Sequence, residues 1–347
     1  MAQRLHPDNF TPPQRTPWGG SKIGANYKAG LGLSDVQSKV GESWEISVEP
    51  TFPSRLVESG ELLSEAIAQD PVAWLGAEIA HRHGGQTPLL VKLLDSADNL
   101  SVQVHPSGDD PKLGPGESGK PEGWVVLEAE PGGGLYLGFR PGVGASEVAA
   151  CIDEGGALDE LMNFVPVERG DAFVIAAGTP HAIGRGVTLV EPQWVAPGSS
   201  GVTYRFWDWN RRYNAAGDLD PTGKPRELHL ARSLEVTTFL GAGDIPLSES
   251  CRFESVPLAR AEWEFHRSVA LECPAFVLER WQGSGQRLFK PFGTMVTLTC
   301  VKGRARLESS SGALNLRMGE SAVVPAAEGE FTLYLYRGEI FSCRSNV

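Results

Sequence analysis

Length and charge set the first limits on what this chain can be. Its 347 residues are enough for two domains with separate cores, because single cores stop growing near ~250 residues. Its 31 Lys+Arg against 43 Asp+Glu give a formal net charge of -12, which argues against nucleic acid or an anionic membrane as a partner. A phosphate-bearing substrate would need a local basic pocket.

The cysteines and the N-terminal segment bear on the compartment. The five cysteines are odd in number and form no C-x-x-C pair, so neither a disulfide framework nor a thiolate zinc site is expected. The N-terminal segment has no apolar signal-peptide core, and no run approaches the ~20 apolar residues of a membrane span. We expect a soluble cytoplasmic protein, either a monomer or a weak homo-oligomer.

Apolar patterning predicts a mainly β chain with a few helical insertions. Residues 1–30, rich in Pro, Gly and aromatics, are expected to form an ordered loop region. Strands are predicted at 41–50, 88–94, 101–106, 124–127, 134–139 and 187–194, with a buried strand and a Gly-Thr-Pro turn over 169–184. Helices are predicted over 61–81 with a break at Pro71, over 145–163 with Leu158, Leu161 and Met162 on one face, and over 226–236 as a single linker.

An internal repeat links the two halves of the chain. GESAVVPAAEGE, at 319–330, aligns with GDAFVIAAGTPH, at 170–181, as a Gly-acid turn, a buried strand and a small-residue turn. This alignment puts Glu330 at the position of His181, and the preceding strand VTLTCVKGRARL contains no His. We infer a duplicated β-barrel whose C-terminal copy cannot build the same metal site.

The strand SVQVHP, at 101–106, holds the first candidate ligands. Alternation puts Gln103 and His105 on one face and two valines on the other, which suits the inside of a barrel that holds an ion. The alternative is a half-exposed strand whose polar face meets water.

Two further residues can join Gln103 and His105. Glu122 begins the strand after a polar loop, and His181 follows the Gly-Thr-Pro turn. Two imidazoles, an amide oxygen and a carboxylate suit zinc, although another first-row metal stays open. Gln103 favours Lewis-acid chemistry over a redox iron site, which more often uses His and carboxylate alone. The alternative is that these are ordinary polar residues at strand ends.

Several separate motifs occur in a consistent order, and together they resemble a known family. They are WGG, GESWEIS, PLLVKLLDSADNLSVQVHP, GKPEGW, AAGTPHAI, LVEPQ and TYRFWDWNR. Over residues 17 to about 235 the chain resembles the type I mannose-6-phosphate isomerases, zinc enzymes of the cupin superfamily. The resemblance implies two cupin-type jelly-roll β-barrels: a catalytic domain over 1–235 with helical insertions, and a degenerate, metal-free barrel over 236–347.

The resemblance also implies roles for site residues. Gln103, His105, Glu122 and His181 would bind one Zn²⁺ per chain, Lys120 and Arg205 would be active-site cations, and Glu191 would be an active-site carboxylate. Further substrate contacts are expected from Lys92, Ser101 and Trp18. The chain departs from many relatives within residues 178–209, where Trp194, Trp207 and Trp209 are expected to reshape the pocket.

The expected activity is an aldose-ketose isomerisation that interconverts mannose 6-phosphate and fructose 6-phosphate through a cis-enediol. Glu191 is the first candidate for the base, with Lys120 or a metal-bound hydroxide as rivals. Three alternatives stay open: a metal-dependent isomerase of another sugar phosphate, a non-catalytic sugar-binding cupin and an iron-dependent oxygenase.

Overall fold

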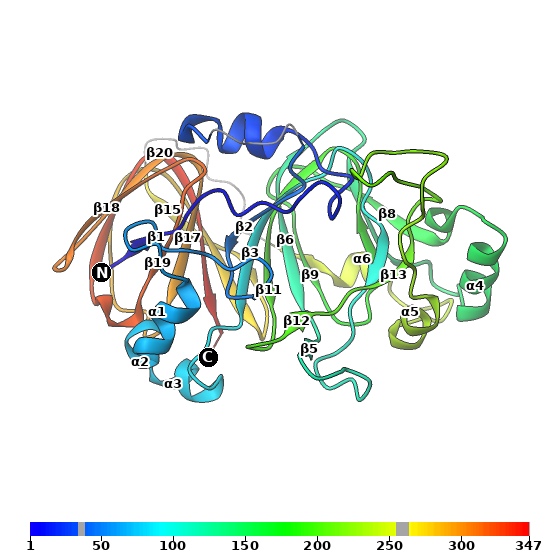
Figure 1. The fold of residues 1–347 in the computed structure, drawn as a ribbon, viewed down its shortest axis with the longest axis horizontal. Coiled ribbons are helices and arrows are strands. Elements are labelled where there is room, and N and C mark those ends of the chain that lie inside the picture. Colours follow the sequence, from blue (N-terminus) through cyan, green and yellow to red (C-terminus); the bar gives the residue numbers. More distant parts are fainter. Residues whose placement is uncertain (34–38, 255–263, 347) are drawn as a thin grey trace.

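Two β-barrels lie side by side along the long axis of the molecule (Figure 1). The structure is a computed structural model that describes residues 1–33, 39–254 and 264–346. The part of the region predicted to be β-rich that falls at 255–263 lies outside the described residues. Within the described residues, no helix is both long and apolar enough to cross a membrane.

The first barrel is built from a six-stranded and a five-stranded antiparallel sheet. In spatial order the larger sheet contains β14 (Arg252–Phe253), β9 (Ala172–Ile175), β6 (Glu122–Ala129), β11 (Val187–Trp194), β3 (Leu89–Asp95) and β2 (Glu42–Ile46). The smaller sheet contains β13 (Tyr204–Trp207), β4 (Val102–Val104), β10 (His181–Ile183), β7 (Gly134–Phe139) and β8 (Met162–Pro166). Two short strands, β5 (Glu117–Ser118) and β12 (Ser200–Gly201), pair in parallel beside them.

The second barrel repeats this strand order. It contains β1 (Gln3–Arg4), β19 (Ser321–Val324), β17 (Val296–Ser309), β20 (Phe331–Ser345), β16 (Phe276–Phe289) and β15 (His266–Glu272), with β18 (Gly312–Arg317) paired to β17. The long strands β16, β17 and β20 each serve both sheets, and register shifts at Gly283–Gly285 and near Gly303 mark where they bend. The predicted duplication is therefore visible in the topology.

The two larger sheets pack against each other, which explains why the run PLLVKLL is apolar on its outer face as well as, apart from Lys92, on its inner face. All seven residues of β3 are buried. Its outer residues Val91 and Leu93 belong to one cluster with Leu278 and Phe341 of the second barrel. A strand covered on both faces reads as a continuous apolar run, so this packing accounts for the pattern.

Each barrel also receives a strand from the other part of the chain. β1 pairs with β19 in the second barrel, whereas β14 pairs with β9 in the first. The predicted domain boundary between residues 235 and 236 stays a prediction. β14 lies beyond that boundary in the sequence and pairs with a strand of the first barrel.

The structure corrects the repeat alignment by one residue. His181 faces into the first barrel and pairs with Gln103, and the position that does the same in the second barrel is Phe331, which pairs with Phe289. Glu330 instead forms an exposed ion pair with Lys290. The turn of the second copy, which includes the 3-10 helix η4 (Ala326–Glu328), is one residue longer, so residues after it shift by one.

Aromatic rings occupy the interior of the second barrel where the first has polar residues. Phe331 stacks on Phe289 with ring centroids 5.2 Å apart, and Trp281 lies 4.3 Å from Phe289. All three are buried. The second barrel consequently has an apolar core at the place of the candidate ligands.

Replacing Phe331 by Ala should lower the free energy of unfolding by about 3–5 kcal/mol, because it opens a cavity in this aromatic core. The metal binding and catalytic rate expected of the first barrel should stay unchanged, since that barrel is untouched. Denaturant unfolding with a parallel assay measures both, and Phe164→Ala, at a half-exposed phenylalanine of β8, is the matched control. A kcat loss in a folded Phe331→Ala protein would contradict a structural role.

The helices lie outside the two barrels (Figure 1). α1 (Leu63–Gln69), α2 (Pro71–Leu75) and α3 (Ala77–Arg82) form the predicted insertion, and the break is as expected, with Asp70 capping α2 through the Ala73 amide at 3.1 Å. The N-terminal region is ordered, as expected, and includes the π-helix η1 (Ile23–Tyr27) and the 3-10 helix η2 (Ala29–Leu31).

Two helical predictions extend too far. The helix expected over 145–163 ends as α4 (Ala145–Asp153) because Gly155 adopts a φ of 70°. The 3-10 helix η3 (Leu158–Leu161) follows, and Met162 begins β8. The linker helix starts only at residue 230, as α5 (Leu230–Val236), and a short α6 (Leu247–Ser250) comes after it. α4 and α5 cover the outer face of the smaller sheet of the first barrel.

Candidate metal centre and active-site pocket

Strand register gathers polar side chains on the inner face of the larger sheet. Glu122 on β6 lies opposite Gln193 on β11, and two residues along β11 Glu191 lies opposite Lys92 on β3. Residues two apart on a strand share a face, so the four side chains form one polar row inside the barrel.

The facing sheet contributes a second row. Gln103 on β4 lies between His181 on β10 and Arg205 on β13. Val102 and Val104 are fully buried in the cluster beneath the helices on the other face. The predicted alternation of SVQVHP is confirmed, and the half-exposed alternative is wrong.

Three of the predicted ligands converge in space. The Nε2 atom of His105 lies 3.4 Å from one carboxylate oxygen of Glu122, and the Nε2 atom of His181 lies 3.3 Å from the other. The three ligand atoms lie within 4.8 Å of one another, and each of the three residues is at most 2% exposed.

The backbone sets the tautomer of both imidazoles. His105 Nδ1 lies 2.9 Å from the Val202 carbonyl oxygen, and His181 Nδ1 lies 2.9 Å from that of Thr179. A carbonyl only accepts, so each Nδ1 carries the proton and each Nε2 presents a lone pair toward Glu122. Backbone anchoring of this kind is typical of metal-binding histidines.

A cation placed between these atoms would satisfy lone pairs on both sides of the contacts. The His105 Nε2 atom and one Glu122 oxygen are buried without a hydrogen-bond partner among the described residues. Burial lowers the pKa of His181 to about 3 and also lowers that of His105, so both imidazoles are neutral. Burial raises the pKa of Glu122, but Lys120 and the imidazoles outweigh it and hold that pKa well below its usual range. The triad therefore has the composition and protonation state that fit a divalent ion.

Gln103 and Lys120 flank the triad. The side-chain amide nitrogen of Gln103 lies 3.3 Å from His181 Nε2. The Lys120 ammonium lies 3.3 Å from Glu122. Burial lowers the pKa of Lys120, but the carboxylates of Glu122, Glu191 and Glu42 outweigh it and raise the pKa, so Lys120 is a cation.

Glu191 has a proton affinity suited to proton transfer. Trp124 donates to one of its oxygens at 3.0 Å and Gln193 to the other at 2.6 Å, while the Lys92 ammonium lies 3.6 Å away. Burial and the charge of Glu122 raise the pKa of Glu191 to about 7, against the opposing effect of Lys92.

A pair of guanidinium groups lies near the opposite wall. Arg205 Nε donates to Ser101 Oγ at 3.0 Å. Burial and the neighbouring charge of Arg226 lower the pKa of Arg205 to about 10. Arg226 lies 3.8 Å from Asp208, and its Nη1 atom is buried without a hydrogen-bond partner among the described residues. Two neighbouring cations with spare donors are suited to a dianion.

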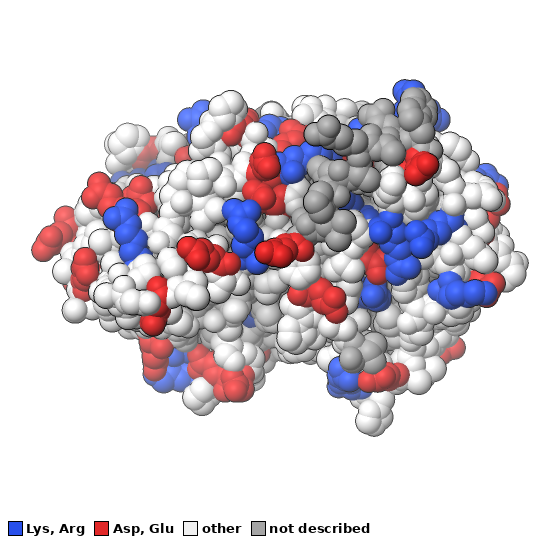
Figure 2. Space-filling model, turned by 180° about the vertical axis from the view of Figure 1, so that it is seen from behind, with Lys and Arg blue, Asp and Glu red and all other residues white. Residues whose placement is uncertain are grey.

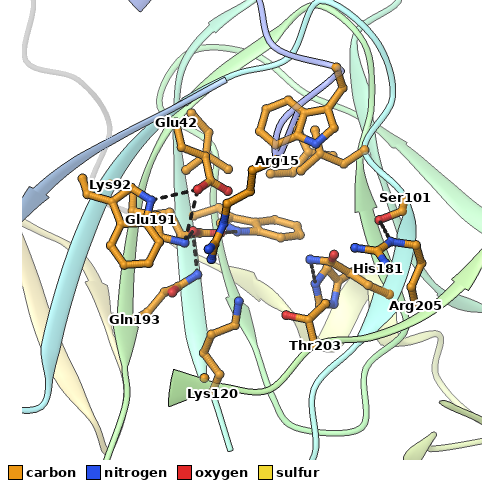
Figure 3. A pocket seen from close by; sticks show the side chains of 18 of the residues that line it. Arg15, Glu42, Lys92, Ser101, Lys120, His181, Glu191, Gln193, Thr203 and Arg205 are labelled. Carbon is orange, nitrogen blue, oxygen red and sulfur yellow. Dashed lines mark hydrogen bonds and ion pairs between the residues drawn. The ribbon is translucent and has the colours of Figure 1, made fainter. Parts of the chain in front are cut away.

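These groups enclose a pocket of about 280 Å³. Figure 3 shows Lys92, Glu191 and Gln193 on one side, with His181 and Arg205 on the other. Eight of the ten sequence-predicted site residues line the pocket: Trp18, Lys92, Ser101, Gln103, Lys120, His181, Glu191 and Arg205. His105 and Glu122 complete the triad beside it. The structure thus brings all ten together, and their individual roles stay predictions.

Several pocket residues were missed. Gln193 and Trp124 follow Glu191 and Glu122 by two positions, so strand alternation could have found both. Arg15 and Arg226 come from irregular segments, where no periodicity marks them.

The expectation for the tryptophan-rich segment is wrong. Trp194, Trp207 and Trp209 are not among the pocket-lining residues. Trp207 and Trp209 pack in the cluster on the outer face of the smaller sheet, and the tryptophans that line the pocket are Trp18, Trp44 and Trp124.

Fold and site together define a double-barrel cupin with a buried His-Glu-His cluster suited to a metal ion. Residues 12–127 match the family described as phosphomannose isomerase type I, catalytic domain, and residues 268–340 match the mannose-6-phosphate isomerase cupin domain. The chain belongs to the type I phosphomannose isomerase family.

Named relatives cover nearly the whole chain. This chain is 28% identical over 326 residues to mannose-6-phosphate isomerase ManA of Bacillus subtilis, and the alignment covers 92% of each chain. It is 28% identical to the mannose-6-phosphate isomerase of Streptococcus mutans, covering 89% of this chain and 88% of that one. A crystal structure of the Bacillus subtilis mannose 6-phosphate isomerase superposes with a TM-score of 0.79 at 22% identity over 99% of both chains. A mannose 6-phosphate isomerase bound with zinc and yttrium superposes at 0.71, with 19% identity over all of both chains.

Proposed function

We propose that this chain interconverts mannose 6-phosphate and fructose 6-phosphate as a zinc-dependent aldose-ketose isomerase. The observation that carries the proposal is the buried His105–Glu122–His181 triad, with both Nδ1 atoms anchored on backbone carbonyls, beside a pocket that also contains Glu191 and Lys120. Family membership supports the substrate class.

Gln103, His105, Glu122 and His181 would hold the zinc ion. When bound there, zinc supplies Lewis-acid polarisation of the sugar oxygens on which negative charge develops. The remaining steps fall to the residues of the chain itself.

Glu191 is the base in this proposal. Its carboxylate removes the C2 proton of the open-chain aldose and returns a proton to C1 of the cis-enediol, while a proton moves from the O2 hydroxyl to O1. A carboxyl group with a pKa of about 7 is well matched to taking and giving a proton near neutral pH. Lys120, held as a cation by surrounding carboxylates, stabilises the enediolate.

The substrate phosphate lies at Arg205 and Arg226 in this scheme. Ser101 orients Arg205 through its hydroxyl, and Arg226, which also lines the pocket, supplies the second guanidinium group. A phosphate dianion between the two guanidinium groups relieves their mutual repulsion, so an acidic protein can still bind it. Trp18 and Lys92 are the other proposed substrate contacts.

Conversion of mannose 6-phosphate to fructose 6-phosphate, before and after chelation and zinc restoration, tests the proposal. We expect activity to disappear on chelation and to return with zinc, with one zinc bound per chain. A zinc-loaded protein that leaves mannose 6-phosphate unchanged but isomerises another sugar phosphate would refute the substrate assignment.

Replacing Arg226 by Gln should raise KM for mannose 6-phosphate about 10- to 100-fold, because a charge-assisted hydrogen bond of about 1.5–3 kcal/mol is lost. The kcat should change much less, since the reacting carbons lie elsewhere. Steady-state kinetics measures both, and Arg212→Gln, at an exposed arginine outside the pocket lining, is the matched control. A fall in kcat at unchanged KM would argue against a phosphate contact.

A further inference from the structure

The outer face of the smaller sheet differs between the two barrels. In the first barrel this face is apolar, and Val102 and Val104 pack there against residues of α5 such as Leu234. In the second barrel the corresponding face, formed by β18, β17, β20 and the end of β16, is open, and Tyr336 is 55% exposed. It lies at the end of the molecule away from the first barrel (Figure 1).

Arginine and tyrosine side chains form two rows across this face. Arg304 on β17 lies opposite Arg317 on β18 and Tyr336 on β20. One step along, Arg306 lies opposite Asn315 and Tyr334. The residues of both rows line a groove of about 1140 Å³, here called the arginine groove.

Arginines outnumber carboxylates in the lining of the arginine groove. Its lining includes five arginines (Arg4, Arg304, Arg306, Arg317 and Arg337) and a single carboxylate, Glu320. Arg306 pairs with Glu308 and Arg4 with Glu58, both outside the lining, while Glu320 is shared between Arg317 at 3.5 Å and Arg4 at 4.0 Å.

Arg304 stands out within this set. Among the described residues, its side chain has no ion-pair or hydrogen-bond partner, and it faces Arg317 directly across the strand pair. Like charges directly opposite each other on a sheet are destabilising. The chain as a whole has a net charge of -12, so this concentration of cationic groups is local. Its positive potential would attract an anion. Figure 2 shows basic and acidic side chains interspersed over much of the rear face, with basic side chains gathered toward the end of the second barrel.

We propose that the arginine groove binds a small molecule that carries a di- or triphosphate chain. Guanidinium groups match phosphate oxygens in charge and in the spacing of their donors. The groove is far larger than one phosphate requires and lies slightly above the ~300–1,000 Å³ typical of small-molecule sites. The rings of Tyr334 and Tyr336 beside the arginines offer flat apolar faces on which a ring attached to the phosphate chain stacks. This site is independent of the isomerase pocket.

Calorimetric titration of the full chain with tripolyphosphate, ATP and adenosine tests the proposal. Tripolyphosphate should bind with one equivalent per chain at low salt and weaken as salt rises. The double variant Arg304→Gln/Arg317→Gln should bind it at least about tenfold more weakly. If ATP binds more tightly than tripolyphosphate and this gain in affinity is lost in Tyr336→Ala, the ligand is a nucleotide. If ATP and tripolyphosphate bind with equal affinity, the phosphate chain alone is recognised. Adenosine alone should not bind.

Two controls separate this groove from other sites. Arg287→Gln removes an exposed charge of the same barrel outside the groove lining and should leave the affinity within about twofold. Arg205→Gln disables the isomerase pocket and should leave one equivalent of binding intact. The groove variants should retain kcat/KM for mannose 6-phosphate.

Three results would overturn the proposal. The double variant could bind tripolyphosphate as tightly as the parent, or the binding could vanish in Arg205→Gln, which would place it in the isomerase pocket. The parent could also fail to bind tripolyphosphate and instead self-associate through this face, with the association lost in the double variant. That last result would make the face a contact between copies of the chain.

Discussion

Replacing Glu122 by Gln should empty the metal site and reduce kcat/KM for mannose 6-phosphate by at least about a thousandfold. Glu122 is the single carboxylate of the triad, and its two oxygens face His105 and His181. A neutral amide in its place leaves a divalent ion without an anionic ligand, so the several kcal/mol that Lewis-acid stabilisation contributes are lost. Metal analysis of the purified variant and an isomerase assay at saturating zinc measure the two effects.

The controls separate metal loss from unfolding. Lys120 keeps a buried charge without its nearest carboxylate in this variant, so some loss of stability is expected as well, and circular dichroism must show that the protein is folded. Glu130→Gln, which removes an exposed carboxylate just beyond the other end of β6, should retain both zinc and activity. A folded Glu122→Gln protein with one tightly bound zinc would refute the assignment of this residue as a ligand.

Glu191→Gln should lower kcat by about 10²- to 10⁴-fold while zinc content stays at one per chain. That range is what a positioned general base contributes, and the isosteric amide keeps the shape of the site. The exchange of the substrate C2 proton with solvent, followed in D₂O by NMR, should fall in parallel with kcat. Steady-state kinetics and metal analysis complete the measurement.

The matched control is Glu42→Gln. Glu42 also lines the pocket, lies 3.9 Å from Lys92 and accepts a hydrogen bond from Trp44 at 2.8 Å, so its substitution removes a comparable charge. We expect only about a tenfold loss, since Glu42 is not the proposed base. If both variants lost activity equally, or if Glu191→Gln kept normal proton exchange, Lys120 would become the stronger candidate.

The pH dependence of kcat/KM follows from the same residue. Because burial and Glu122 raise the pKa of Glu191 to about 7, the carboxyl group is protonated, and inactive as a base, below that pH. Activity should therefore fall as the pH drops, with a midpoint no higher than about 7, because a divalent cation nearby favours the ionised form. The acidic limb should be absent from the residual activity of Glu191→Gln, and a limb that persists unchanged would assign it to another group.

Much of the site was predictable because strand alternation is a local property. Gln103 and His105 share a face with the valines on the other, whatever the rest of the chain does, and the structure shows this arrangement. The Pro71 break and the repeated strand at 321–324 were predictable for the same reason, since each depends on neighbouring residues.

Errors arose where position depends on turn length or on contacts between distant segments. One extra residue in a turn moved the counterpart of His181 from Glu330 to Phe331, and no local pattern reports such a shift. The tryptophans of the 178–209 segment were expected to reshape the pocket but pack outside its lining. Arg226 reaches the pocket from an irregular segment that has no periodicity to reveal its direction.

By itself the sequence determined the strand faces, the identity of the candidate ligands and the duplicated architecture, because these follow from side-chain alternation and motif order. Only the tertiary structure decided the protonation states and the pairing of the charged side chains. The neutral imidazoles, the raised pKa of Glu191 and the unpartnered side chain of Arg304 depend on burial and on groups brought together from distant strands. Desolvation and Coulomb interactions act through space, and the order of residues along a chain does not reveal those distances.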